Sequence, residues 1–247
     1  MKMTNLGALM SSTCWICGNI ATTGEHMNKR SDLRSVFGHV SQNNPLYKHD
    51  ANEVNQVIKG LNVVALKSPG RLCANCNNAR TQSHDRAWEK LSLALREHDR
   101  HIQPGKFIRT TKIFRYDTKR EMLNVHLYFT KLFGCHIAGN DVPISLGEFS
   151  EAIKNGVAHP KIFLRFGCGA MFTSQPVTGM SDMWLALTSH DNQVRFATWL
   201  YHVGDISVNV MFAVPGERRQ GLIDAWHPSH GTTRLKVANF LEDTPEK

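Results

Sequence analysis

The sequence contains no long apolar run, no low-complexity tract and no internal repeat. A membrane-spanning helix needs about 20 consecutive apolar residues, so the absence of such a run argues against one. The first residues, MKMTNLGALMSSTCW, also lack the extended apolar segment and small-residue cleavage site of a secretory signal. We therefore expect a cytoplasmic protein with no membrane partner.

No strong excess of one charge and no basic tail is present. The 247 residues include 29 Lys and Arg against 21 Asp and Glu, a formal net charge of +8, and 41% are hydrophobic. This composition excludes disordered and collagen-like classes and is typical of one large or two modest globular domains. The basic excess favours an acidic partner such as a phosphate backbone, but a solvated basic surface explains it equally well.

Cysteine is sparse, and the six cysteines are unevenly distributed. Two C-x-x-C pairs account for four of them: Cys14, Cys17, Cys73 and Cys76. Thiols stay reduced in the cytoplasm, and each C-x-x-C pair can present two sulfurs to one ion. Together the pairs predict a structural Zn²⁺ with four sulfur ligands and no open coordination position. The isolated Cys135 and Cys168 are expected to be small buried hydrophobic residues.

An acidic residue precedes a histidine between the two cysteine pairs. Glu25 and His26 lie in TGEHMNKR, and Asn77 directly follows the last cysteine in RLCANCNNAR. A carboxylate beside an imidazole allows one side chain to bind a hard cation while the other acts on water. A Glu-His dipeptide alone is usually surface decoration, but its position between the cysteine pairs indicates a function.

The order C-x-x-C, Glu-His, C-x-x-C-Asn resembles the HNH, or ββα-metal, endonuclease family, in particular its zinc-stabilised branch, over about residues 12–98. The resemblance implies an enzyme that hydrolyses phosphodiester bonds in nucleic acid, with DNA as the expected substrate. It implies Glu25 and Asn77 as ligands of a catalytic Mg²⁺ or Mn²⁺ and His26 as the general base. Many members have Asp in place of Glu25, and the segment between His26 and Cys73 is longer here than in compact members.

Other residues near this motif are candidates for accessory roles. Asn62 is a candidate to orient the histidine or a strand-edge turn residue, and Asn78 replaces Asn77 if the helix register differs by one. His84 and Asp85 follow Asn77 by about two helical turns, where they either approach the metal or form a break between two helical pieces. Phosphate contacts, or merely solvated surface, are expected from four basic residues: Lys29, Arg30, Arg80 and Arg86.

Hydrophobic periodicity predicts an α+β fold. A hairpin is expected over residues 12–28. Helices are expected around residues 33–37, 51–59, 85–103, 120–133 and 145–155, the last opened by a capping box. Strands are expected at 61–66, 106–116, 161–166, 183–189, 194–201 and 206–213, with a turn at 67–70.

Pro104-Gly105 marks a predicted domain boundary. Residues 1–104 are expected to form a zinc-bound, HNH-like nuclease domain. Residues 105–247 are expected to form an α+β domain with an antiparallel sheet that serves substrate selection, homo-oligomerisation or a protein partner. The alternative is a catalytically silent, zinc-scaffolded module that binds nucleic acid or protein.

Overall fold

The computed structural model describes residues 13–51, 53–97, 103–168, 177–188 and 193–240, and these form an α+β fold around a seven-stranded sheet. Its strands, in spatial order, are β5 (Phe107–Arg109), β11 (Arg234–Asn239), β6 (Ile162–Cys168), β10 (Ile206–Ala213), β9 (Val194–Val203) and β7 (Thr178–Met180), with β8 (Trp184–Leu187) also paired to β9. All pairs are antiparallel except β11 with β6. The predicted α+β class and antiparallel sheet are confirmed.

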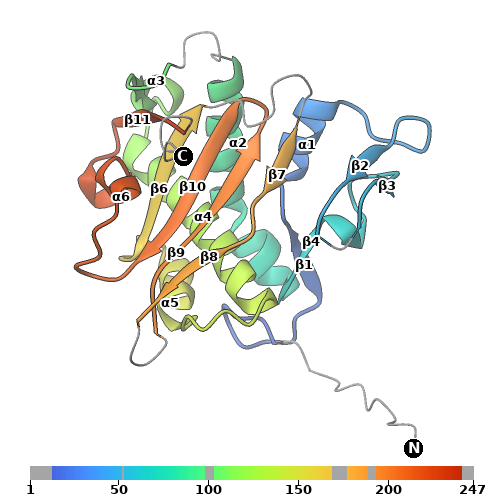
Figure 1. Cartoon of the computed structure of the whole chain (residues 1–247), viewed down its shortest axis with the longest axis horizontal. Helices are drawn as coiled ribbons and strands as arrows, with labels where there is room; N and C mark the ends of the chain where they lie inside the picture. The colour runs from blue at the N-terminus through green and yellow to red at the C-terminus, as the bar shows by residue number, and fades with distance from the viewer. Residues whose placement is uncertain (1–12, 52, 98–102, 169–176, 189–192, 241–247) are drawn as a thin grey trace, which may run out of the picture.

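Helices α2 (Gln82–Glu97) and α4 (Thr118–Gly139) pack against one face of this sheet (Figure 1). Asp117 caps α4 by accepting a hydrogen bond from the Arg120 amide, and most of the helix is buried because the sheet, α2 and α5 (Gly147–Asn155) surround it. Among the described residues beyond 104 there are also three short helices: α3 (Thr110–Ile113), α6 (Gln220–Ile223) and η4 (Pro228–His230). No helix in the described part of the chain is long and apolar enough to cross a bilayer.

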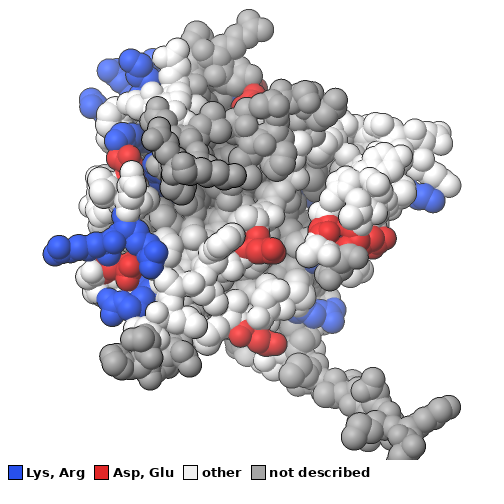
Figure 2. Space-filling model, in the orientation of Figure 1, with Lys and Arg blue, Asp and Glu red and all other residues white. Residues whose placement is uncertain are grey.

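The face turned toward the viewer in Figure 2 carries charges of both signs. Lys and Arg side chains gather along one side of this face, near α6, with acidic side chains among them. Opposite charges also pair in the structure, where Glu217 contacts both Arg195 at 3.3 Å and Arg219 at 3.1 Å. The described residues on this face therefore form no broad surface of one charge.

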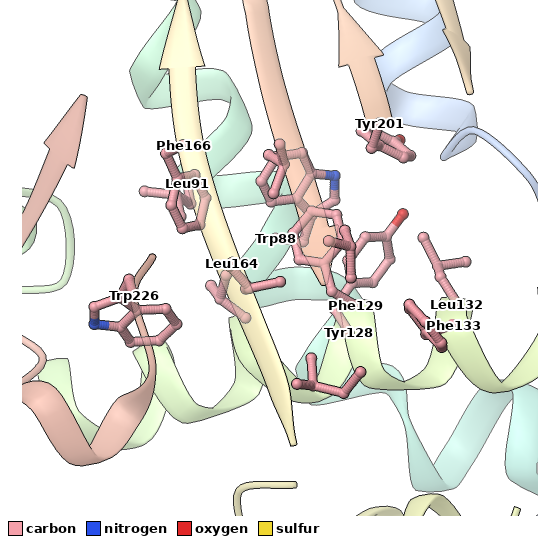
Figure 3. Packing of buried hydrophobic residues seen from close by; sticks show 14 of the residues in the cluster. Trp88, Leu91, Tyr128, Phe129, Leu132, Phe133, Leu164, Phe166, Tyr201 and Trp226 are labelled. Atoms are coloured by element: carbon pink, nitrogen blue, oxygen red, sulfur yellow. The ribbon is translucent and has the colours of Figure 1, made fainter. Parts of the chain in front are cut away.

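One apolar core joins the two halves of the chain. Trp88 from α2 lies edge-on against Phe129 from α4, with ring centroids 4.7 Å apart, and stacks on Tyr128 at 5.7 Å (Figure 3). Tyr201 from β9 meets the same indole ring at 5.6 Å. The core thus contains residues from both sides of residue 104. The domain boundary at that residue stays a prediction.

The N-terminal part adds two small two-stranded sheets beside this core (Figure 1). β1 (Thr23–His26) pairs with β4 (Lys67–Leu72), and β2 (Leu46–Lys48) pairs with β3 (Gln56–Ile58). Along the chain, α1 (Arg30–Phe37) follows β1, and the 3₁₀ turn η1 (Val64–Leu66) directly precedes β4. The second cysteine pair leads into a short π-helix, η2 (Cys76–Arg80), directly before α2.

Three N-terminal sequence predictions were wrong. Residues 61–66 form no strand but a turn followed by the 3₁₀ turn η1, and the true strand β4 occupies the predicted turn at 67–70. Gly70 is needed there for close approach, since a Cβ atom at this position would lie 2.0 Å from the carbonyl oxygen of Cys135 on α4. The helix predicted at 51–59 is also wrong, because residues 56–58 form β3.

The second half follows the sequence predictions more closely. Strands β6, β9 and β10 match apolar or alternating runs because each has a face in the core, whereas β8 matches an apolar run although most of its residues are exposed. The strand predicted at 106–116 is correct only for β5, after which the chain turns into α3. β7 and β11 were missed, α4 is longer than predicted, and α5 begins without a side-chain cap at Leu146.

Candidate functional site

The four cysteines of the two C-x-x-C pairs come together in space. Their sulfur atoms all lie within 4.8 Å of one another, and those of Cys17 and Cys73 are 3.6 Å apart. A tetrahedral zinc site with Zn–S bonds of 2.3 Å requires sulfurs about 3.8 Å apart. Within the described ranges, this is the one group of three or more His, Cys, Asp and Glu side chains close enough to share an ion. The cluster could hold zinc, as the spacing predicts.

Local backbone turns place these sulfurs. The Cys14 carbonyl accepts a hydrogen bond from Gly18 at 2.8 Å, and the positive φ of Gly18 (79°) lets the chain reverse there. In the second pair, the Cys76 amide donates to the Cys73 sulfur at 3.4 Å. Burial raises the pKa of the Cys73 thiol, but hydrogen bonds from Cys76 and Cys17 outweigh burial and lower it to about 7. Such bonds favour the thiolate that binds metal.

Asn77 is held against the strand that carries Glu25 and His26. The Thr23 hydroxyl donates to the Leu72 carbonyl at 2.9 Å and lies 3.1 Å from the Asn77 side-chain nitrogen. Because the hydroxyl hydrogen is already used, the amide nitrogen must donate to Thr23. Oδ1 of Asn77 therefore faces away, where it is buried without a hydrogen-bond partner among the described residues. Asn78, the alternative to Asn77, is exposed.

The His26 ring is oriented by a backbone carbonyl. Its Nε2 lies 2.9 Å from the oxygen of Leu61, and since a carbonyl only accepts, Nε2 carries the proton and Nδ1 keeps its lone pair. Burial lowers the pKa of His26, as do the charges of nearby lysines and Arg30, so the ring is neutral. The sequence suggested Asn62 for this orienting role. Its side chain is exposed in the turn before η1, and the neighbouring Leu61 carbonyl takes the position instead.

The carboxylate of Glu25 meets a lysine that the sequence analysis did not identify. Lys131 on α4 places its Nζ 3.0 Å from Oε2 of Glu25 and 2.9 Å from Oδ1 of Asp85 on α2. The same Nζ lies 3.3 Å from the hydroxyl of Thr81, which itself donates to the Cys76 carbonyl at 2.9 Å. These contacts connect the cysteine site, β1 and both long helices.

The buried groups of this centre shift one another's pKa values. Desolvation lowers the pKa of Lys131, but the carboxylates of Glu25 and Asp85 outweigh burial and raise it. Burial in turn raises the pKa of Glu25, and Lys131 opposes that shift. A signal for Lys131 was present in LYFTKLFGC, where a single charge stands within an apolar stretch of helix.

The remaining candidate residues fall into two groups. His84 and Lys29 lie near this centre: the His84 side chain is buried with no partner found for Nδ1 within the described residues, and Lys29 approaches Asp85 at 3.9 Å. The helical break lies at Thr81, between η2 and α2, and not at residues 83–85. The other basic candidates are exposed: Arg30, Arg80 and Arg86.

The two remaining cysteines differ in environment. Cys135 is buried, as expected, and its sulfur accepts a hydrogen bond from the Trp15 indole at 3.4 Å. Cys168, at the end of β6, is only partly buried.

Comparisons of this chain with known protein families, with curated proteins and with solved structures find no match.

Proposed function

We propose that this protein is a metal-dependent endonuclease of the HNH type that hydrolyses phosphodiester bonds in nucleic acid, with DNA as the expected substrate. The observation that carries the proposal is the hydrogen bond between Asn77 and Thr23. It brings the amide that follows the last cysteine against the strand of Glu25 and His26, which is the arrangement that the motif order implies.

In this proposal a Zn²⁺ bound by the four cysteines has a structural role. Four sulfur ligands leave no coordination position for water or substrate. The ion would connect the turn before β1 to the start of η2 and thereby fix Thr23 opposite Asn77. Free thiols at such a site suit a reducing compartment, so we keep the cytoplasm as the proposed location.

Two side chains of the motif supply oxygen ligands of the type that a hard divalent cation prefers. The buried, unpartnered Oδ1 of Asn77 and the carboxylate of Glu25 are ligand types that Mg²⁺ and Mn²⁺ prefer. When bound there, such an ion would stabilise the negative charge that develops on the leaving oxygen of the phosphodiester.

His26 is the proposed general base. Its Nδ1 holds the lone pair and takes a proton from the attacking water, while the bond from Nε2 to the Leu61 carbonyl keeps the ring fixed. The lowered pKa of His26 keeps the base unprotonated at neutral pH. Exposed Arg30 on α1 and the basic residues of η2 and α2, Arg80 and Arg86, are proposed to contact phosphates, together with Lys29.

A plasmid-nicking assay tests this function. Zinc-loaded protein with Mg²⁺ or Mn²⁺ is expected to nick supercoiled DNA, and His26→Ala should reduce the rate by about 10²–10⁴-fold, the usual contribution of a general base. His39→Ala is a matched control, because His39 is exposed in the loop after α1. Equal nicking by wild type and His26→Ala would contradict the proposal.

One observation favours a second candidate, a catalytically silent module that binds nucleic acid or another protein. Lys131 already neutralises Glu25 at 3.0 Å, as a structural ion pair would. Retention of DNA at low salt without cleavage would support a nucleic-acid-binding module, since phosphate contacts are strongest there. Neither cleavage nor retention would support a protein partner, with residues 105–247 as the proposed surface for it or for a second copy.

A further inference from the structure

Lys131 is an unusual residue for the middle of a core helix. Its side chain is fully buried on α4, and its ammonium group contacts three oxygen acceptors, from Glu25, Thr81 and Asp85. The Tyr128 ring lies 5.8 Å from the same Nζ. A buried lysine is tolerated only when its charge is compensated, and here two carboxylates from separate elements compensate it.

The position of this ammonium group bears on metal binding. Glu25 is the carboxylate of the proposed catalytic site, and Lys131 already lies 3.0 Å from it. A divalent cation bound to Glu25 at about 2.0–2.2 Å would lie within a few ångströms of the ammonium group, and like charges at that separation repel strongly where water is excluded. The carboxylate must therefore divide its interaction between the two cations or exchange one for the other.

We infer that Lys131 is a positioning residue of this site: it holds Glu25 and Asp85 in place from α4 and competes with a divalent cation for their carboxylates. Lys131 thereby sets the concentration of divalent metal at which the site is filled. The inference rests on the proposed function for the role of Glu25, and it extends the site into the second half of the chain. Residues beyond 104 then contribute directly to the chemistry of the N-terminal motif.

A purely structural lysine makes a different prediction. If Lys131 only stabilised the fold, its replacement would loosen Glu25 and Asp85 and leave metal affinity unchanged or lower. If it competes, its replacement leaves the carboxylates of Glu25 and Asp85 without the Lys131 ammonium group between them, and Mn²⁺ binding becomes tighter. Asp85 would still have Lys29 at 3.9 Å, so the centre does not lose all of its positive charge.

The test measures Mn²⁺ affinity by electron paramagnetic resonance of full-length, zinc-loaded protein. Lys131→Met, which is similar in length and uncharged, is expected to bind Mn²⁺ about tenfold more tightly than wild type. Lys161→Met is the matched control, because Lys161 pairs with Glu148 at 2.7 Å on the surface, and its affinity should equal that of wild type. Lys131→Gln keeps a hydrogen-bond donor without the charge and is measured in parallel in case the methionine variant fails to fold.

Each outcome decides the inference. Tighter Mn²⁺ binding by either variant, or folding of a variant only when Mn²⁺ is added, supports competition. Unchanged or weaker binding, or variants that stay unfolded at every Mn²⁺ concentration, would overturn it and leave Lys131 a structural residue. Plasmid nicking by wild type with unchanged affinity in the variants would reject the inference alone. Tighter binding in the variants without nicking by wild type would reject the endonuclease alone.

Discussion

Helix α2 contributes to two buried polar centres that differ in how completely their atoms are paired. The first surrounds Asp32 of α1, which is fully buried. Its carboxylate accepts hydrogen bonds from four side chains: Trp88 at 2.8 Å, Ser92 at 2.8 Å, Tyr201 at 2.7 Å and Arg96 at 3.2 Å. The second centre surrounds Lys131. Nδ1 of the nearby His84, and Oδ1 of Asn77 in η2, find no partner within the described residues.

The difference separates a structural centre from a candidate site. Buried polar atoms are almost always paired, so a complete network needs no ligand, whereas open atoms are available to a ligand or to a water molecule. Trp88 and Tyr201 belong to the aromatic core of Figure 3, and the Tyr201 hydroxyl also accepts a bond from the Lys29 amide at 3.0 Å. The complete centre thus fixes the segment that follows His26 and provides a rigid frame for the open one.

Loss of the metal that the four cysteines could hold should separate the two centres most strongly. Structural zinc contributes on the order of 10 kcal/mol where it holds a small domain together. We expect Cys76→Ser to lose zinc and to lose hydrogen-exchange protection in β1 and β4, while α4 stays protected. Cys168→Ser, which removes a thiol outside the cluster, should keep both. Metal analysis and exchange mass spectrometry measure these results, and full protection of β1 in the Cys76 variant would contradict them.

Disruption of the complete centre should lower stability without removing the open site. Asp32→Ala leaves four donors without their acceptor, and breaking a buried charged network costs about 3–5 kcal/mol. Asp224→Ala, which breaks a more exposed pair with Lys236, should cost about 0–1 kcal/mol. Urea unfolding measures both variants. Equal losses of unfolding free energy would show that the Asp32 network contributes no more to stability than a surface ion pair.

The contact that holds β1 near Lys131 can be tested through its partner strand. Gly70→Ala places a Cβ atom 2.0 Å from the Cys135 carbonyl of α4, and such overpacking costs about 1–3 kcal/mol. Gly60→Ala is the matched control, since no atom lies within 4 Å of a Cβ there. Thermal unfolding should show a lower Tm only for the Gly70 variant, and an unchanged Tm would mean that β4 moves away from α4 at little cost.

The open centre should also respond to pH through His84. Burial, together with Lys131, lowers the pKa of His84 to about 4, so the folded state stays neutral where the unfolded state, with a pKa near 6.5, takes up a proton. The unfolded state then binds more protons, and stability falls as pH drops from about 6.5 to about 4, by about 1.4 kcal/mol per unit. Between neutral pH and about pH 5, the free energy of unfolding of His84→Leu should therefore fall by about 2 kcal/mol less than that of wild type. Urea unfolding without added Mg²⁺ or Mn²⁺ measures this difference. Equal losses of unfolding free energy in wild type and His84→Leu would contradict the prediction.

The sequence predicted the second half of the fold better than the first. Strands such as β9 and β10 carry apolar residues on faces that pack in the core, so their patterns reflect their environment directly. The segment from residue 51 to 72 contains Pro and Gly and few periodic apolar residues. Its structure depends on β1 and α4, which local propensity does not report.

What the sequence determined by itself is the order and spacing of the ligand-type residues. Two C-x-x-C pairs predict one four-sulfur cluster because the spacing within each pair fixes how its two sulfurs can point. Glu25, His26 and Asn77 were identifiable from the same motif. Only the tertiary structure decided that Leu61 orients the histidine, that Thr23 orients the amide and that Lys131 neutralises Glu25. These partners lie up to about a hundred residues away, and folding alone brings their atoms within hydrogen-bond distance.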